Sequence, residues 1–322
     1  MAAPLTDHSA LLPLLPEELV GVVESVEALT QGLSGAAVYA VTTSRGQFVL
    51  RVQARQQDDH YFAQQLHILR LAADAGVAPA IVHVDTAARA VVSVRVSAGS
   101  IGAALADPVQ REALLASVVD RLRALHALDP SGVPERDPIP FARAAWEAGR
   151  ERPGFPAWAV SLAPTLDALA ATLAEDPRRV VSHNDVNPGN IMWDGTRAWL
   201  VDWEVTGLGH PYFDLATFAL FLRLEDDVAF GLVALHDGAP LDDRSRASFR
   251  ALRQLAGLMC GLTFLGLVDD LSVRPAPTRE DAPSLGDCYA AMREGKLDMR
   301  SAHGQASMGL ALLAQGFPPK EA

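Results

Sequence analysis

One stretch, Val180–Val205, gathers residues whose types and spacing could do chemistry. His183, Asp185 and Asn190 stand in the pattern H-x-D-x-x-x-x-N, and Asp202 follows a second apolar run. Transfer of a phosphoryl group to a hydroxyl needs a carboxylate that accepts or orients the hydroxyl proton. It also needs an Asn and an Asp that hold Mg²⁺ on the phosphates. The pattern alone is short enough to arise by chance, and its polar residues could equally form turns.

The residues between the two proposed metal ligands predict a β-hairpin. Apolar residues at Ile191–Trp193 and Ala198–Val201 flank a D-G turn, which is a frequent hairpin connection. A hairpin returns the chain to its starting point, so we expect Asp202 to lie beside Asn190.

The stretch resembles the catalytic and metal-binding segments of the aminoglycoside phosphotransferase / choline kinase family, distant relatives of protein kinases. The resemblance continues through the triplet D-W-E at Asp202–Glu204 and the segment G-H-P-Y-F-D-L-A at Gly209–Ala216. It covers the chain from Leu29 to about Val268. The H-N-D order and the acid that ends the triplet are most similar to the choline/ethanolamine kinase branch. The last fifty residues carry no family signal.

The resemblance implies an α+β, bilobal, protein-kinase-like fold. Its small N-terminal lobe, residues 1–97, would hold an antiparallel sheet and bind the nucleotide. The larger and mostly helical lobe, residues 98–322, would carry the catalytic and substrate-binding groups.

The same resemblance implies roles for individual residues, with ATP and Mg²⁺ as cofactors. Asp185 would be the catalytic carboxylate, and Asn190 and Asp202 would bind the metal. Arg51 would hold the ATP phosphates. The other implied nucleotide contacts lie on a glycine-rich loop and at the interlobe hinge, at Gly32, Ser34, Gly35, Arg95 and Ser97.

Arg51 raises a question about its partner. Kinases pair the basic residue of this strand with a Glu on the next helix, but that spacing here reaches Gln65. Gln can accept a hydrogen bond but cannot form an ion pair. Either the pair is weakened, or a nearby acid such as Asp58 or Asp59 takes its place.

Two further residues are candidates for substrate binding, Asn187 and Glu204. Asn187 could donate a hydrogen bond to the γ-phosphate or could simply form a turn. A choline site should show an aromatic cage and an acid, and relatives often carry these where this chain has Val205 and Phe221. His183 is expected to brace the loop.

These observations predict an ATP-dependent enzyme that phosphorylates a hydroxyl of a small molecule, with an amino alcohol as the first candidate. One alternative is an aminoglycoside, another antibiotic or a sugar as the substrate of the same chemistry. An alternative from another class is a nucleotide-binding pseudokinase or regulator, which Gln65 favours and the intact Asp185, Asn190 and Asp202 oppose.

The overall composition limits the expected binding partners and the cellular compartment of the protein. The 322 residues carry a net charge of −12, which is unfavourable for nucleic-acid binding and compatible with a cationic substrate. The two cysteines, Cys260 and Cys288, have no metal-ligand spacing. The longest apolar run, Leu255–Val268, is too short to span a bilayer. We therefore expect a cytoplasmic protein with no membrane insertion.

Periodicity and capping residues predict the elements that position the site. Asp107 is expected to cap a helix that ends at His126, and Asp214 to cap a helix over Leu215–Leu224. A further helix is expected over Asp59–Ala75. The expected strands of the N-terminal lobe are Val26–Leu29, Ala37–Thr42, Gln47–Val52, Ile81–Asp85 and Ala90–Val96.

Overall fold

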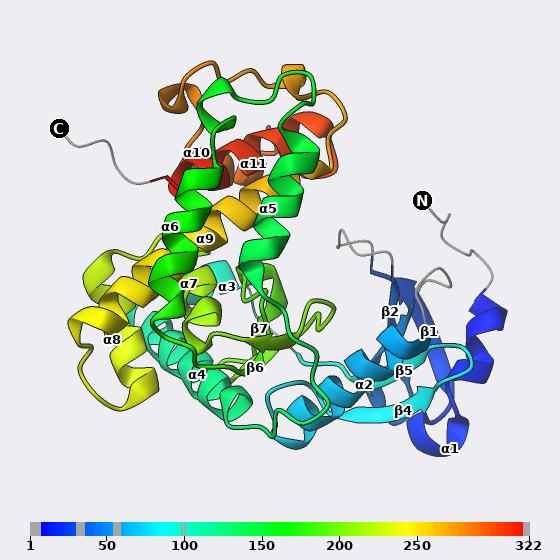
Figure 1. Cartoon of the computed structure of the whole chain (residues 1–322). Coiled ribbons are helices and arrows are strands. Elements are labelled where there is room, and N and C mark those ends of the chain that lie inside the picture. Colours follow the sequence, from blue (N-terminus) through cyan, green and yellow to red (C-terminus); the bar gives the residue numbers. More distant parts are fainter. Residues whose placement is uncertain (1–7, 30–35, 54–58, 98, 100, 318–322) are drawn as a thin grey trace. The chain divides into compact units, whose positions relative to one another are not determined.

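The computed structural model describes residues 8–29, 36–53, 59–97, 99 and 101–317. The chain forms two compact units, and each consists of two segments of sequence (Figure 1). Unit 1 comprises Met1–Pro134 and Gly189–Thr206, and unit 2 comprises Glu135–Pro188 and Gly207–Ala322. The boundary expected after residue 97 separates a nucleotide-binding lobe from a catalytic lobe. It remains a prediction, because the two units are defined by their internal contacts and not by the functions of the lobes.

Unit 1 contains a five-stranded antiparallel sheet, in the order β1-β2-β3-β5-β4. All five strands expected from the sequence are present, within a few residues of the expected ends. They are β1 (Val23–Ala28), β2 (Ala37–Thr43), β3 (Gly46–Val52), β4 (Ile81–Asp85) and β5 (Ala90–Val94).

Alternation along the strands gives the sheet two apolar faces. Phe48 and Leu50 of β3 are buried in one cluster, together with residues from the short helices η1 (His8–Leu14) and α1 (Glu17–Val20). On the other face, Val91 of β5 packs against α2 (Asp59–Asp74). Arg51 is the register partner of Val91, and neighbouring side chains in register share a face. Arg51 is therefore on the α2 side of the sheet.

Unit 1 also contains two helices and the two strands of a hairpin, which lies between Asn190 and Asp202 in the sequence. They are α3 (Ile101–Ala106), α4 (Pro108–His126), β7 (Ile191–Trp193) and β8 (Ala198–Leu200). The predicted helix cap is confirmed, since the Asp107 carboxylate accepts hydrogen bonds from the first-turn N–H groups of α4. The predicted hairpin is also confirmed, with Ile191 paired to Leu200.

Two arginines attach this hairpin and α4 to the end of α2. Arg121 donates to the Gly76 carbonyl at 3.2 Å, and Arg197 donates to the same oxygen. The Leu200 N–H donates to the Val77 carbonyl at 2.9 Å. The positive charge of these arginines is favourable at the C-terminus of α2 because of the helix dipole. The three hydrogen bonds together attach the hairpin to the end of α2.

Unit 2 is built around one long helix, α9 (Asp243–Gly266), which packs against helices on several sides. Where α9 meets α11, Gly261 lacks a side chain because a Cβ there would lie 2.5 Å from the Leu313 nitrogen. The other elements of the unit are α5 (Pro138–Gly149), η2 (Ala157–Ala159), α6 (Ala163–Ala174), β6 (Val180–Ser182), β9 (Gly207–Gly209), α7 (Pro211–Phe221), α8 (Asp226–Asp237), η4 (Leu271–Val273), η5 (Arg279–Asp281), α10 (Leu285–Arg293) and α11 (Ala302–Gln315). The last fifty residues thus contribute α11 to the core of unit 2.

One predicted boundary is wrong. The helix expected to begin after Asp214 begins at Pro211, and His210 is its N-cap. Proline fits the first helical position because its φ is preset and its missing N–H is not needed there. Asp214 lies inside the helix and is fully buried.

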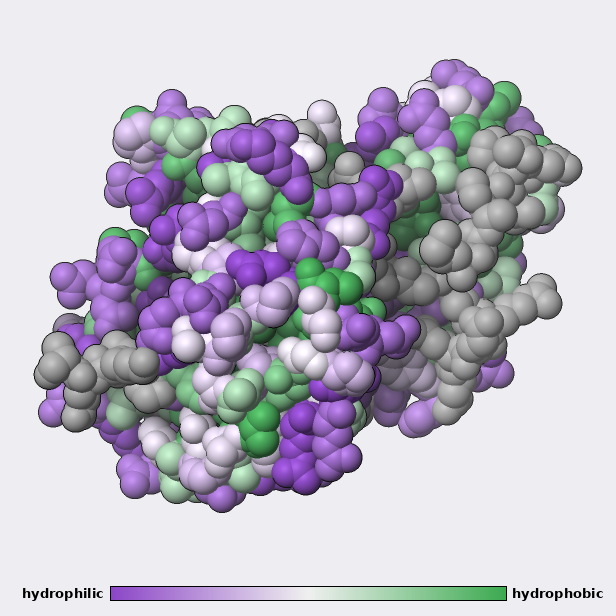
Figure 2. Space-filling model, turned by 90° about the horizontal axis from the view of Figure 1, so that it is seen from above, coloured by the Kyte–Doolittle hydropathy of each residue, from purple (hydrophilic) through white to green (hydrophobic). Residues whose placement is uncertain are grey.

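Hydrophilic side chains cover most of the face shown in Figure 2, with smaller hydrophobic areas among them. Within the described ranges, no helix has the length and apolarity that a membrane crossing requires.

Candidate active site

The loop that carries Asp185 belongs to unit 2 and is held by a buried carboxylate. Asp214 Oδ2 accepts a hydrogen bond from the His183 N–H at 2.9 Å, and Asp214 Oδ1 accepts one from the Asn184 N–H at 2.7 Å. Asn184 has a φ of 64°, a left-handed conformation that Asn tolerates better than most residues. The helix α7 therefore anchors the loop through one side chain, a role for Asp214 that the sequence did not reveal.

The short strand β9 gives the loop its second support. It pairs antiparallel with β6, with Val181 opposite Leu208. Gly209 lies against the loop, and a Cβ at this position would be 2.7 Å from Asn184 Oδ1. Glycine at this position lets the strand pack closely against the Asn184 side chain of the loop.

Asn187 contacts the candidate catalytic residue itself. Its Nδ2 donates a hydrogen bond to Asp185 Oδ1 at 2.9 Å, and both side chains are half-buried. Such a bond restricts the rotation of the carboxylate. The sequence offered a phosphate contact or a turn for Asn187, and orientation of Asp185 is a third role that neither alternative included.

The two predicted metal ligands lie at the open end of the hairpin in unit 1. The Val201 N–H donates to the Asn190 carbonyl at 3.0 Å, so the hairpin pairing continues up to the residue before Asp202. Asp202 has a φ of 66°, which is strained for a residue other than glycine. Its Oδ1 is buried and accepts no hydrogen bond from the described residues.

These oxygen atoms suit Mg²⁺. Asn190 and Asp202 both supply hard oxygen donors. Asp202 Oδ1 is buried without a hydrogen bond, and a metal ion could satisfy this oxygen instead. Magnesium is usually bound by one or two carboxylates together with substrate phosphates and water. The described residues contain no cluster of three or more His, Cys, Asp or Glu side chains that could hold a metal.

Arg51 contacts acids from the D-W-E triplet. Its Nη1 lies 3.3 Å from Asp202 Oδ1, and its Nη2 hydrogen-bonds Glu204 Oε1. Between these two acids, Trp203 is buried and donates to the Leu200 carbonyl at 3.1 Å. The triplet is therefore anchored at its centre and presents both carboxylates to one guanidinium.

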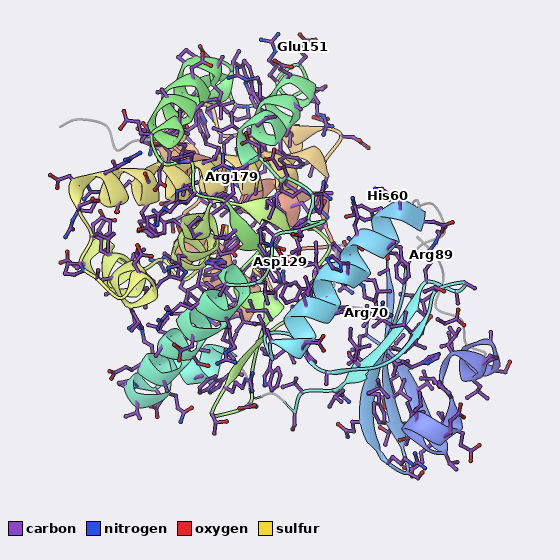
Figure 3. All side chains as sticks on the ribbon, turned by 60° about the horizontal axis from the view of Figure 1, so that its bottom comes forward. His60, Arg70, Arg89, Asp129, Glu151 and Arg179 are labelled. Atoms are coloured by element: carbon purple, nitrogen blue, oxygen red, sulfur yellow. The ribbon has the colours of Figure 1, made fainter. Side chains whose placement is uncertain are left out.

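The predicted substitute partner Asp59 does not serve Arg51. Asp59 is exposed and forms its ion pair with Arg89, which lies next to α2 in Figure 3. Gln65 hydrogen-bonds the main chain of Glu204 instead of Arg51. Asp58 lies outside the described residues.

The remaining nucleotide-site candidates are less informative. Gly32, Ser34 and Gly35 lie outside the described residues. Arg95 and Ser97 are both exposed, and the Arg95 N–H donates to the Gln47 carbonyl at 2.9 Å as an extension of the sheet.

Beneath the catalytic loop, a buried polar cluster holds the start of α7. His210 Nδ1 accepts from the Tyr212 N–H, and His210 Nε2 lies 3.1 Å from Asp176 Oδ2. Burial lowers the pKa of His210 to about 4, so this imidazole is neutral near pH 7. The hydrogen-bonded guanidinium of Arg178 holds the pKa of Asp176 far below its usual value.

Known structures similar to this one include small-molecule kinases and related proteins. A choline/ethanolamine kinase family protein from Mesorhizobium loti superposes with a TM-score of 0.68 at 20% identity, over 95% of each chain. LicA, a choline kinase from Streptococcus pneumoniae, is similar in its complex with AMP, with a TM-score of 0.59 at 19% identity over 90% of this chain and 92% of that one. A putative aminoglycoside phosphotransferase from Ralstonia eutropha gives 0.60 at 14% identity over 95% and 98%.

These likenesses confirm the predicted kinase-like α+β fold, and at such identities they speak for the fold alone. No curated protein matches the chain by sequence. The family model described as "Phosphotransferase enzyme family" matches residues 25–258. That match includes the Asp185 loop, its Asp214 anchor and the hairpin with its D-W-E triplet, and the chain therefore belongs to the phosphotransferase enzyme family.

Proposed function

We propose that this phosphotransferase moves the γ-phosphate of ATP to a hydroxyl of a small molecule in a Mg²⁺-dependent reaction. The observation that carries the proposal is the arrangement around Asp202. A buried carboxylate oxygen without a hydrogen bond lies 3.3 Å from a guanidinium and at the base of the hairpin that begins with Asn190. Phosphates need cationic donors and their metal needs oxygen ligands, and this arrangement offers both.

Asp185 acts on the acceptor hydroxyl. The transition state of phosphoryl transfer is loose in most analyses, so a carboxylate contributes mainly by orienting the nucleophile. The hydrogen bond from Asn187 holds the Asp185 carboxylate in one rotamer, and the Asp214 anchor holds its backbone. Both contacts lower the cost of ordering the nucleophile.

Arg51 binds the phosphates of the nucleotide through its planar guanidinium. Asn190 and Asp202 hold the Mg²⁺, which would neutralise charge on the phosphates. The AMP complex of LicA is a nucleotide complex of a structure with the same fold, and this supports a nucleotide site in the present chain.

The acceptor is proposed to be an amino alcohol. Two kinds of support favour it: the H-N-D and D-W-E motifs, and the fold shared with a choline/ethanolamine kinase family protein. The net charge of −12 agrees with a cationic acceptor. Choline itself is less favoured, because Val205 and Phe221 stand where relatives carry an aromatic residue and an acid.

A second candidate acceptor is an aminoglycoside, another antibiotic or a sugar, which the likeness to a putative aminoglycoside phosphotransferase favours. A pseudokinase is disfavoured, because Asp185, Asn190 and Asp202 are all retained. The cytoplasm is the proposed place of the reaction, a view that rests on the low cysteine content of the sequence.

The deciding experiment is a phosphorylation screen over amino alcohols, aminoglycosides and sugars, with Mg²⁺ and with EDTA. Asp202→Ala serves as the inactive control. We expect Mg²⁺-dependent product formation with an amino alcohol and none with the variant. Equal nucleotide affinity in Mg²⁺ and in EDTA, measured by calorimetry, would show that the metal assignment is wrong.

A further inference from the structure

Glu204 is held at two atoms by two elements of unit 1. Its carboxylate hydrogen-bonds the Arg51 guanidinium on β3. Its main-chain carbonyl accepts hydrogen bonds from Tyr61 Oη at 2.6 Å and from Gln65 Nε2 at 2.8 Å. Tyr61 and Gln65 are four residues apart on α2, so they project from the same face of the helix. The helix therefore holds the peptide of Glu204, and the strand binds its charge.

Both ends of the Gln65 amide are used. While Nε2 donates to the Glu204 carbonyl, Oε1 accepts a hydrogen bond from Gln53 Nε2 at 2.8 Å, and Gln53 is buried. An amide supplies a donor and an acceptor, whereas an ionised carboxylate supplies acceptors only. A glutamate at position 65 would place an oxygen against the Glu204 carbonyl oxygen. The contacts thus require glutamine at this position.

We propose that Glu204 is the positioning residue for Arg51, and that Tyr61 and Gln65 fix Glu204 by binding its carbonyl. The inference rests on the proposed function, since Arg51 is positioned for nucleotide phosphates. In this chain the acid that pairs with Arg51 comes from the D-W-E triplet. Gln65 serves as a hydrogen-bond donor to the Glu204 carbonyl and does not replace the glutamate of other kinases.

The arrangement has a specific consequence for nucleotide binding. Asp202 and Glu204 flank the buried Trp203 in a single triplet, and Arg51 contacts both acids. A shift of the Glu204 peptide therefore moves the guanidinium and the metal ligand together. Loss of the Gln65 donor should weaken binding of the Mg²⁺-nucleotide more than binding of the nucleotide alone.

The test compares Gln65→Glu, Tyr61→Phe and Gln64→Glu with the wild-type enzyme. Gln64 is the matched control, because it undergoes the same charge change on the same helix and its amide hydrogen-bonds His60. Calorimetry gives the Kd of a non-hydrolysable ATP analogue with Mg²⁺ and with EDTA, and steady-state kinetics separates KM from kcat. Circular dichroism melting shows whether each variant is folded.

We expect Gln65→Glu to raise the Kd with Mg²⁺ by about tenfold or more, since the Glu204 carbonyl loses one donor and faces a negatively charged carboxylate oxygen instead. Tyr61→Phe should raise it by about three- to fivefold because one donor remains, and Gln64→Glu should leave it unchanged. Wild-type affinity in Gln65→Glu would overturn the inference, and so would equal effects of the changes at 64 and 65. If the wild-type enzyme binds no nucleotide, the proposed function itself fails, which is a separate result.

Discussion

The Asp185 loop of unit 2 and the D-W-E triplet of unit 1 are stabilised in different ways. The loop of unit 2 is held by Asp214, which is fully buried and accepts hydrogen bonds from the backbone N–H groups of His183 and Asn184. The D-W-E triplet of unit 1 is held through Arg51, whose side chain is 26% exposed and contacts two carboxylates. A buried carboxylate with short hydrogen bonds is costly to disturb, whereas a partly exposed ion pair can exchange partners at small cost.

This difference matches the demands of phosphoryl transfer. A residue that orients a hydroxyl has to keep one position through many turnovers. Groups that bind phosphates and metal must release and reform their contacts in every cycle. We therefore expect variants of the loop to change kcat or stability, and variants of the triplet and of Arg51 to change nucleotide binding.

The largest effect is expected from Asp185→Asn. The variant keeps the size of the side chain and loses its charge, so kcat should fall by roughly 10²–10⁴-fold, the range for a positioned acid–base group. The nucleotide Kd should be unchanged, because the residues proposed to hold the phosphates and the metal, Arg51, Asn190 and Asp202, lie in unit 1. Rapid-quench kinetics and calorimetry measure the two quantities. A wild-type kcat would reduce Asp185 to a turn residue.

Arg51→Ala should be next in size. Loss of the guanidinium should cost roughly 2–4 kcal/mol of transition-state stabilisation, or about 30- to 1,000-fold in kcat/KM. Arg51→Lys should be milder, since it keeps the charge and loses the bidentate geometry. The matched control is Arg89→Ala, which removes an ion pair to Asp59 on the same face of the sheet. If Arg51→Ala retains normal kinetics, Arg51 is not part of the site.

Asp214→Asn tests the anchor of the loop. An amide can replace only one of the two acceptor oxygens and turns its NH₂ group toward a backbone N–H. The free energy of unfolding should fall by about 2–3 kcal/mol, with nucleotide affinity unchanged. Asp242→Asn is the control, because Asp242 caps α9 at the surface and Asn is an equally good cap. Equal urea midpoints for the two variants would contradict the anchoring role.

The sequence predicts elements whose signals are local. The hairpin was recognisable from its D-G turn, and α4 from the pairing of Asp107 with a proline at its first position. The strand β9, with sequence G-L-G, was not recognisable because glycine has low β-propensity. Its existence depends on pairing with β6, which lies far away in the sequence.

Contacts between residues that are distant in the sequence could not be predicted from the sequence. Arg51 and Glu204 are separated by 153 residues, and no periodicity connects them. Kinases place an acid at the position that corresponds to Gln65. The sequence places Gln65 there and suggests a weakened pair or a nearby acid, whereas the structure shows that Glu204 faces Arg51.

The smallest effect concerns pH and the base of the catalytic loop. Burial lowers the folded-state pKa of His210 to about 4, below the unfolded value of about 6.5. The unfolded chain therefore binds more protons between these values, and the free energy of unfolding must fall as pH decreases from about 6.5 to 4. The pKa of Asp176 is also lowered, but stability from this carboxylate is lost only below its ordinary value of about 3.8.

His210→Asn should remove the titrating group and keep an N-cap for α7, because Asn caps helices well. Its unfolding free energy should vary less between pH 6.5 and 4, by about 2 kcal/mol relative to the wild type. His303→Asn, at an exposed position on α11, should retain the wild-type slope. Urea titrations at several pH values measure the slopes directly. If the slopes of wild type and His210→Asn coincide, His210 is not held neutral by burial in the folded state.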